Sequence, residues 1–500
     1  MENIKKVALF SGICIGLLGV SACNENESAS NNGEGKASND PISIMAVLHT
    51  PEVPDNKLQD LLEEKADSKL DIQWVPSDNY TERLNTAFAT GTLPQVVTVS
   101  NPDLFREAIM DGQFWEIGPY LDEFEHLSKL NPDILDNSKV DDKLYSLYLG
   151  RPLSRSGIIY RKDWADNLGL EAPTNVDEVF EMARAFTEDD PDGNGQDDTI
   201  GLVDRGEMYY GAFKTISSWH GTPNGWGEKD GVITPEFMFD EYMDTLNYIK
   251  GIHENGYMNQ DFPVTSKTDQ VNMFKTGKAG LYIGSMGDVE GIYRDATALN
   301  PDAEFDVHNY VEGPDGEYKI WSIPGYGSLL MFPKNSVETE EDLKKILGFY
   351  DKLMETETMN LLVWGIEGEH YTVEDGLART MTENQQAVDR EVRPFLSLEI
   401  GEPESSGRYE GYSDYEPKMK ATELEKDNEN YLIPDLSIGL HSEEYIHNNE
   451  RLQEIINDAT YKYVLGQIDE EGFNKAVENW KNQGGQKIMD EFTEHYKQKQ

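Results

Sequence analysis

The chain has 500 residues, of which 38% are hydrophobic and 10% aromatic, so it has enough apolar side chains for a large core and is not wholly disordered. This length predicts two or three domains, or two lobes of one protein. The 43 Lys and Arg against 94 Asp and Glu give a formal charge of −51. That balance argues against nucleic-acid binding, which needs a basic face, and against adsorption of the folded body to anionic lipid. It predicts a heavily solvated acidic surface.

The first residues predict secretion. Lys5 and Lys6 precede an apolar or small-residue stretch, residues 7–20. As a helix of about 14 residues at ~1.5 Å each, this stretch spans roughly 21 Å, short of the ~30 Å membrane core. We therefore interpret residues 1–22 as a signal peptide. The stretch ends in Val20-Ser21-Ala22-Cys23, which resembles the lipobox of bacterial lipoproteins, in which the cysteine thiol accepts a diacylglycerol. An ordinary signal peptide with an incidental cysteine is the alternative.

The mature chain is predicted to be held by its lipid. Cys14 lies in the leader, so Cys23 would be the only cysteine left, and neither an intrachain disulfide nor a cysteine metal cluster can form. Residues 23–41 then comprise the lipidated cysteine and a flexible tether rich in Asn, Ser, Glu, Gly and Ala. No later segment reaches 18 apolar residues. This order predicts a body at the outer face of the cytoplasmic membrane, lipid-anchored in the Gram-positive manner.

The mature body begins with alternating strands and helices. The predicted strands are residues 42–48, 70–75 and 95–100, and the predicted helices start at Pro54 and at Tyr80, the second ending at Gly91. This alternation is typical of a parallel sheet covered by helices. Ligands of such sheets lie beyond the carboxyl ends of strands. Asn101 and Asp103 fall there and are predicted to bind the ligand, with helix capping as the alternative.

A second α/β unit is predicted further along the chain. Its strands are residues 157–160 and 278–284, and residues 327–332 form one more strand. Capping boxes at Thr174/Asp177 and Thr339/Asp342 open two helices. The tail from about residue 450 is helical and charged. Two α/β units joined by several crossings account for the length better than one sheet.

Residues 190–201 carry the spacing of a calcium loop. Oxygen side chains recur at alternate positions, and Gly195 occupies the sixth position, where an EF-hand turns sharply. Gly201 replaces the bidentate Glu of position twelve, so Thr199, Asp197 or a water must complete the shell. The predicted ligands are Asp190, Asp192, Asn194, Gln196 through its carbonyl, Asp198 and Thr199. The calcium would be structural, fixing the end of the helix before the loop; an acidic surface turn is the alternative.

Several segments together resemble the extracellular solute-binding lipoproteins of carbohydrate ABC transporters, in particular the LplA/LipO-type group; alginate-binding proteins are more distant relatives. The segments are residues 160–164 (YRKDW), 167–169 (NLG), 172–174 (APT), 190–201, 221–226 (GTPNGW), 277–280 (GKAG) and 365–371 (GIEGEHY). The resemblance implies a type II periplasmic-binding-protein fold, in which two α/β lobes hinge around a ligand cleft. It also implies the structural calcium, an oligosaccharide ligand and ABC permease partners. The expected lobes are residues 42–152 with 327–370, and 153–326 with 371–500.

A sugar offers apolar ring faces to aromatic side chains and hydroxyls to carboxylates, amides and Arg. Residues near predicted strand ends or lobe crossings are therefore candidates, with core packing or surface ion pairs as the alternative for each. They are Asn101, Asp103, Arg151, Trp219, Met286, Asp288, Trp321, Tyr326 and Trp364. Arg151 or its neighbour Arg155 would suit a uronate, as found in plant cell-wall oligosaccharides.

The sequence gives no support for catalysis. It contains no HExxH, GxSxG, P-loop or GxGxxG motif, and its nine His form no tight cluster. We therefore expect a binding protein and not an enzyme. A glycoside hydrolase needs only two carboxylates about 5–10 Å apart, so a surface-attached hydrolase remains an alternative, as does a peptide-binding lipoprotein.

Overall fold

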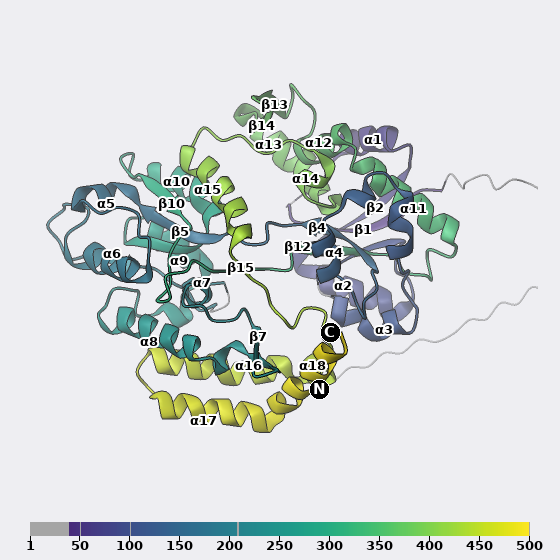
Figure 1. The fold of residues 1–500 in the computed structure, drawn as a ribbon. Helices are drawn as coiled ribbons and strands as arrows, with labels where there is room; N and C mark the ends of the chain where they lie inside the picture. The colour runs from purple at the N-terminus through teal and green to yellow at the C-terminus, as the bar shows by residue number, and fades with distance from the viewer. Residues whose placement is uncertain (1–39, 51, 101, 208–209, 500) are drawn as a thin grey trace, which may run out of the picture. The chain divides into compact units, whose positions relative to one another are not determined.

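Two β-sheets covered by helices organise the described part of the chain (Figure 1). The computed structural model describes residues 40–50, 52–100, 102–207 and 210–499. The predicted signal peptide, Cys23 and nearly all of the tether lie outside these ranges. Within them, no helix is both long and apolar enough to cross a membrane.

The first sheet has five strands in the order β2 (Leu70–Pro76), β1 (Ile42–Leu48), β3 (Val96–Val99), β12 (Tyr326–Met331) and β4 (Ser146–Gly150). The predicted alternation of strands and helices is confirmed: β1 runs parallel to β2 and β3. The direction of the later strands was not predicted: β12 lies antiparallel to β3 and β4. A strand from far along the chain thus completes the sheet.

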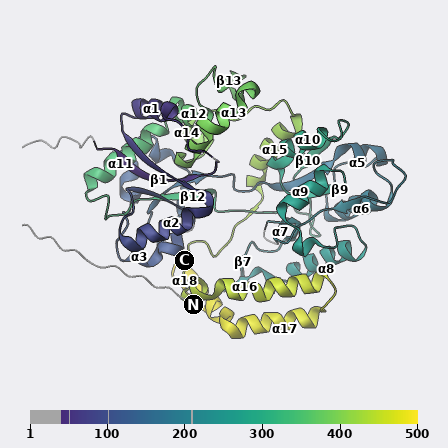
Figure 2. The same cartoon turned by 180° about the vertical axis from the view of Figure 1, so that it is seen from behind.

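Both faces of the first sheet are buried, as the alternating side chains of β1 show. Ile44 packs in a core with α1 (Asn56–Lys65) and α11 (Glu340–Leu353), whereas Met45 packs on the opposite face. There it meets side chains of α2 (Ser77–Thr90) and α3 (Arg106–Met110). Figure 2 shows these two pairs of helices on opposite sides of the sheet. The apolar run of β1 therefore indicates a central strand.

The second sheet has four strands, in the order β10 (Phe305–His308), β5 (Ser156–Arg161), β9 (Ala279–Ser285) and β6 (Ile200–Leu202). β5 is antiparallel to both neighbours, and β6 runs parallel to β9. Ile158 packs in a core with α6 (Val176–Glu188), α7 (Ala212–Trp219) and α8 (Asp240–Glu254). The next residue, Ile159, packs on the other face with α9 (Lys267–Lys275) and α10 (Val289–Thr297).

One of the two predicted capping boxes is confirmed. Thr339 accepts from the Asp342 N–H, and the Asp342 carboxylate accepts from the Thr339 N–H at the start of α11. The other predicted capping box is wrong, because it placed the N-cap of α6 one residue too early. Asn175 is the N-cap of α6, and Thr174 instead donates to the Glu178 carboxylate. Asn is at least as good an N-cap as Thr, so the local sequence allowed both positions.

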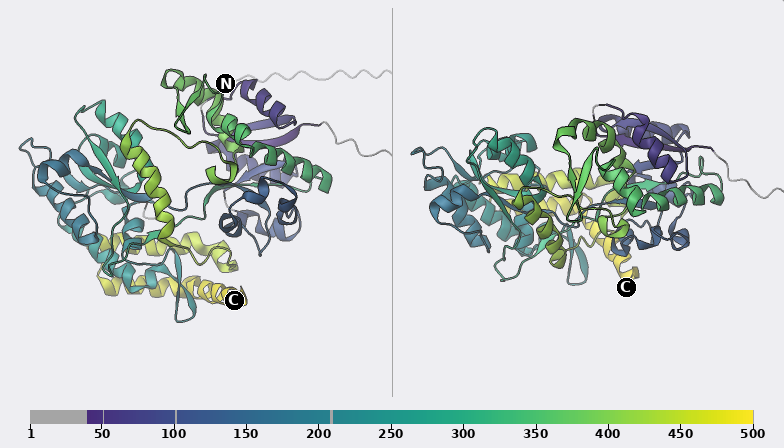
Figure 3. Two further views of the ribbon diagram at one scale, coloured as in Figure 1. Left: turned by 45° about the horizontal axis from the view of Figure 1, so that its top comes forward. Right: turned by 90° about the horizontal axis from the view of Figure 1, so that it is seen from above.

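The helical tail is confirmed and begins earlier than predicted, at Ser442, which caps the first helix. Its helices are α16 (Glu443–Val464), α17 (Glu470–Trp480) and α18 (Gln486–Lys499). Figure 3 shows α16 and α17, in yellow, running side by side. Their aromatic side chains, such as Trp480 and Phe492, join the core of the second sheet.

The remaining helices and strands lie outside the two larger sheets. Residues 388–400 pack in the core of the first sheet through side chains such as Phe395, although the sequence analysis grouped residues 371–500 with the second unit. The remaining strands are β7 (Trp226–Lys229), β8 (Val232–Pro235), β11 (Ile320–Trp321), β13 (Tyr371–Glu374), β14 (Leu377–Thr380) and β15 (Leu432–Ile433). The remaining helices are α4 (Pro132–Asn137), α5 (Lys162–Leu168), α12 (Thr356–Trp364), α13 (Gln385–Ala387), α14 (Pro403–Ser406) and α15 (Glu416–Asp427).

Candidate functional site

A cavity of about 250 Å³ opens at the end of β9 and beside the segment that enters β5. Its walls include Gly284 and Ser285 from β9, Arg155 before β5, and Trp321 from β11. Strand ends are where α/β sheets usually hold ligands, because the connecting segments diverge there. This cavity, called the β9 cavity below, is our candidate solute site.

One wall of the β9 cavity is a compact polar group. The buried Tyr282 hydroxyl donates to Asp288 Oδ2 at 2.8 Å, and Lys267 Nζ donates to the same oxygen at 2.8 Å. Lys267 also hydrogen bonds to the Tyr282 hydroxyl and lies 4.6 Å from the centre of its ring. Burial, and then the Asp288 charge, raise the pKa of Tyr282, so it remains a neutral donor. Lys267 and Asp288 thus offer charged groups next to an aromatic face.

A second wall holds Arg205, whose guanidinium is fixed from several sides. It donates to the Gln270 side chain at 3.0 Å and to the Tyr210 carbonyl at 2.6 Å, and it lies 3.1 Å from Glu207. The adjacent Asp204 is buried and accepts from the Ala212 N–H at 3.0 Å, at the start of α7. The loop that carries Arg205 is therefore anchored at its base.

The nine predicted ligand-binding residues fall into four groups. Asp288 and Trp321 line the β9 cavity. Trp219 and Met286 are fully buried in the two cores of the second sheet, which in this conformation leaves no surface for a solute. Asn101 lies outside the described residues, and the side chain of Asp103 is likewise not described.

The other three predicted residues are associated with the first sheet. Arg151 lies directly over Gly327, where a Cβ would come within 2.9 Å of its Nε. Tyr326 begins β12, and Trp364 ends α12, with its Nε1 donating to the Tyr409 carbonyl at 3.0 Å. None of these three lines the β9 cavity. Their role as solute contacts remains a prediction.

Sequence reasoning missed two of the three basic residues of the β9 cavity: Arg205 and Lys267 were not singled out, whereas Arg155 was named together with Arg151 as suited to a uronate. The three residues come from a loop, a helix and a segment before a strand, at widely separated positions in the chain. No motif links them, and an isolated basic residue most often lies on a solvated surface.

The predicted calcium loop folds around its oxygen atoms. Asp190 Oδ2 accepts from the Gly195 N–H at 3.0 Å, and Asn194 Oδ1 accepts from the Gln196 N–H at 2.7 Å. The Asn194 side chain donates to both Asp192 and Asp198, at 2.9 and 3.2 Å. Oxygen-rich side chains gathered by a glycine-bent loop match the preference of Ca²⁺, so the residues fit the ion. The hydrogen bonds that the Asn194 amide donates to Asp192 and Asp198 would break if its Oδ1 turned toward a bound cation.

Gly201 and Thr199, two positions of the predicted calcium loop, have structural roles of their own. Gly201, the twelfth position, is the middle residue of β6 and lies against α6, where a Cβ would come within 2.2 Å of the Ala183 carbonyl oxygen. This close approach leaves no room for the glutamate of a complete EF-hand. The buried Thr199 donates its hydroxyl to the Phe186 carbonyl at 2.8 Å, so the hydroxyl already holds the end of α6.

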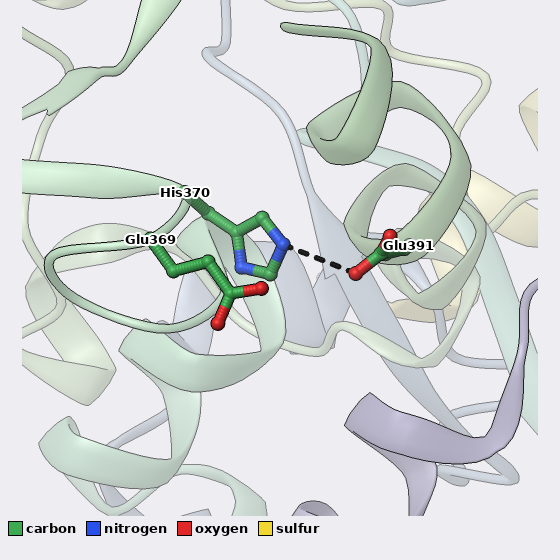
Figure 4. A group of neighbouring side chains, drawn as sticks. All are labelled: Glu369, His370 and Glu391. Carbon is green, nitrogen blue, oxygen red and sulfur yellow. Dashed lines mark ion pairs between the residues drawn. The ribbon is translucent and has the colours of Figure 1, made fainter. Parts of the chain in front are cut away.

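A separate cluster of possible metal ligands comprises Glu369, His370 and Glu391 (Figure 4), whose ligand atoms lie within 4.8 Å of one another. His370 Nδ1 accepts from the Ile366 N–H at 3.0 Å, which places the proton of a neutral ring on Nε2, 3.4 Å from Glu391. A metal at Nε2 would need that lone pair and would leave an imidazolate. Lys57 also pairs with Glu369. The hydrogen bonding therefore fits an ionic cluster better than a metal centre.

The interior of the second sheet holds a charged group on α7. All eight residues of this helix are buried, and Lys214 is only 3% exposed. Lys214 pairs with Glu236, whose carboxylate also accepts from the Gly225 N–H at 2.8 Å. The Asp435 carboxyl lies nearby and accepts from both the N–H and the hydroxyl of Ser437, at 2.8 and 2.7 Å. One buried cation thus faces two partly buried carboxyl groups.

This arrangement predicts a pH effect. Burial raises the pKa of Asp435 from 3.8 to about 6, more than the Ser437 hydrogen bonds and Lys214 lower it. Because the unfolded chain releases this proton first, stability is fully present below pH 4 and is lost as the pH rises to 6 and above. The loss is roughly 3 kcal/mol for about two pKa units. Asp435→Asn keeps the acceptor for Ser437 and should remove this loss.

The measurement is urea unfolding of Asp435→Asn and the unaltered chain at pH 4 and pH 7. Between pH 4 and pH 7, the unfolding free energy of the variant should rise relative to that of the unaltered chain by up to about 3 kcal/mol. Asp375→Asn, in the exposed turn between β13 and β14, is the control and should show no such shift. An Asp435→Asn difference that is the same at both pH values would show that the carboxyl is ionised in the folded chain.

Comparisons with known proteins bear on the solute. A family model described as bacterial extracellular solute-binding protein matches residues 51–354. The polygalacturonan/rhamnogalacturonan-binding protein YtcQ of Bacillus subtilis is 42% identical over 476 residues, covering 93% of each chain. Lipoprotein LipO of the same organism is 32% identical over 490 residues, covering 95% of this chain and 96% of LipO.

Solved structures share the fold at low identity. A human-milk-oligosaccharide (HMO) binding, ABC-transporter-associated solute-binding protein from Bifidobacterium longum infantis superposes with a TM-score of 0.74 at 18% identity, over 92% of this chain and 99% of that one. An EF-hand mutant of the substrate-binding protein FusA from Streptococcus pneumoniae, in complex with fructo-nystose, gives a TM-score of 0.60 at 17% identity. It covers 92% of this chain and 100% of FusA.

Proposed function

Because this chain belongs to the family of bacterial extracellular solute-binding proteins, we propose that it captures an oligosaccharide outside the cell and delivers it, unaltered, to an ABC permease. The type II α/β fold predicted from the sequence is confirmed by the structural relatives. The observation that carries the proposal is the 42% identity, over 93% of both chains, to a protein named for binding polygalacturonan and rhamnogalacturonan.

The ligand we propose is an oligosaccharide of the plant cell wall, with acidic sugars as in the polymers that YtcQ is named for. The β9 cavity supports this, because it places the indole of Trp321 beside hydrogen-bonding charged groups. Asp288 and Trp321 are the predicted residues we assign to the site. Arg151, Tyr326 and Trp364 would join it from the first sheet if the two halves of the chain closed on the sugar.

Capture is proposed to follow a shift between open and closed forms. A ligand can favour the closed form only by contacting it better than the open form. We propose one lobe of residues 42–152, 327–370 and 388–400, and a second of 153–326 with the remainder of 371–500. The reassignment of residues 388–400 rests on Phe395 and its neighbours, which pack in the core of the first sheet.

Anchoring is proposed through a lipid on Cys23, with residues 24–41 as the tether. The leader sequence and the name of lipoprotein LipO support it. The folded body would then work at the outer face of the cytoplasmic membrane, within reach of its permease. Blocking lipoprotein processing should leave the leader attached.

A structural calcium is proposed in the loop of residues 190–201. Asp190, Asp192, Asn194 and Asp198 would supply side-chain oxygens, and Gln196 its carbonyl. The gathered oxygens of this loop support the site, as does the EF-hand named for FusA. Thr199, predicted as the last ligand, is better assigned to α6, so a water or Asp197 would complete the shell. The ion would hold α6 to β6.

The proposed function is tested by calorimetry with galacturonate oligosaccharides and chromatography of the same mixtures. We expect saturable binding of one sugar per chain and no new product after prolonged incubation. Short peptides serve as the control ligand and should give no heat of binding. Release of shorter sugars would identify a surface hydrolase instead, and binding of peptides alone would identify a peptide receptor.

A further inference from the structure

We propose that Arg155, Arg205 and Lys267 form a subsite in the β9 cavity that receives the carboxylate of a sugar acid. The inference rests on the proposed function, because it assigns one chemical group of the captured oligosaccharide to named side chains. It concerns where and how the acidic group is held, which the names of the relatives do not specify.

The side chains that line the β9 cavity carry mostly positive charge. The chain as a whole has 94 acidic and 43 basic residues, yet the charged residues lining the β9 cavity are three basic side chains and only one carboxylate, Asp288. A second, larger hollow of about 1090 Å³ shows the reverse, with one basic side chain. Its charged lining residues are Arg106, Glu107, Asp111, Asp141, Glu443 and Glu450. The β9 cavity is therefore a basic site in an acidic protein, as an anionic ligand requires.

The three cations differ in how many partners they already have. Arg205 is held by Gln270, the Tyr210 carbonyl and Glu207, and Lys267 is held by Asp288. Within the described residues the Arg155 guanidinium makes no hydrogen bond or ion pair. Its backbone carbonyl accepts from the Met286 N–H at 2.9 Å, which fixes its position beside the cavity. Arg155 can therefore offer its donor fork to a carboxylate, a geometry that Arg matches in a bidentate way.

The charged groups around Arg155 also favour binding of a carboxylate. Burial lowers the pKa of Arg151; Glu399 opposes this effect, and the charge of Arg155 adds to it, so the two arginines repel each other. The buried carboxyl of Glu425 accepts from the Gly287 N–H at 3.1 Å; burial raises its pKa, and the charges of Lys418 and Arg155 lower it by less. An incoming carboxylate would relieve the repulsion between the arginines. Trp321, which is 8% exposed, lines the same cavity and adds apolar surface to it.

The test compares a galacturonate trimer with its methyl ester by calorimetry, because the ester removes only the negative charge. We expect the unaltered chain to bind the acid at least tenfold more tightly than the ester. Arg155→Gln should lose this preference, so that it binds acid and ester about equally, and Arg155→Lys should recover part of the preference. Arg294→Gln is the matched control, an exposed arginine on α10 that should retain the full preference.

The outcomes separate the subsite from the function. Equal binding of acid and ester by the unaltered chain would overturn the subsite and leave the receptor function intact. Tighter binding of a sulfated galactose trimer, lost in Arg155→Gln, would assign the subsite to sulfate esters and overturn the carboxylate. If neither the acid nor the ester binds, the proposed function fails and the subsite fails with it.

Discussion

Replacing Lys214 with methionine is expected to lower the free energy of unfolding by about 3–5 kcal/mol. Lys214 lies on the fully buried helix α7 and is the cation that faces Glu236 and Asp435. Methionine has a similar length and fills most of the space. The loss comes from the Glu236 carboxylate, which would remain buried with only the Gly225 N–H as a described partner. Removing one member of a buried pair costs more than the pair itself contributes.

Urea unfolding at pH 7 measures the Lys214→Met effect. Lys250→Met is the control: Lys250 pairs with Glu254 on the accessible side of α8 at 3.7 Å, and its loss should cost less than about 1 kcal/mol. Adding Glu236→Gln to Lys214→Met should restore part of the stability, because the amide removes the unpaired charge. A single variant within 1 kcal/mol of the unaltered chain would show that water reaches Glu236.

Saturating calcium is expected to stabilise the chain by about 4 kcal/mol, the linkage energy when the free ion is at ~1,000 times its dissociation constant. The loop of residues 190–201 would bind the ion only when folded, because its oxygens converge only then. Asp190→Asn should abolish most of the gain. Asp190 has a φ of 47°, which Asn adopts as readily as Asp, so the substitution removes charge without straining the backbone.

The calcium effect is measured as the change in unfolding free energy between chelator and excess calcium. Asp230→Asn is the matched control, since Asp230 also has a positive φ, of 55°, in the exposed turn between β7 and β8, and it should retain the full calcium effect. Magnesium should stabilise less, because it demands a tighter octahedral shell. If calcium leaves the unfolding free energy of the unaltered chain unchanged, the loop is an acidic turn and not a calcium site.

Local sequence signals predicted the elements of this chain well. The capping box at Thr339, the Gly91 that ends α2 with a φ of 67° and the apolar runs of β1 and β9 each depend on a few neighbouring residues. The error at Thr174 has the same origin, because Asn175 offers an equally good cap one residue later. A reader of the sequence alone has no means of choosing between such neighbours.

The sequence by itself determined the order of strands and helices, the acidic surface, the oxygen spacing of the 190–201 loop and the family. These depend on local periodicity and motif. Only the tertiary structure decided that β12 enters the first sheet antiparallel, that Phe395 packs in the first core and that Gly201 has no room for a side chain. It also decided that three basic residues meet in the β9 cavity. Such contacts join distant positions, and their energy comes from shared burial and charge, which no short stretch of sequence records.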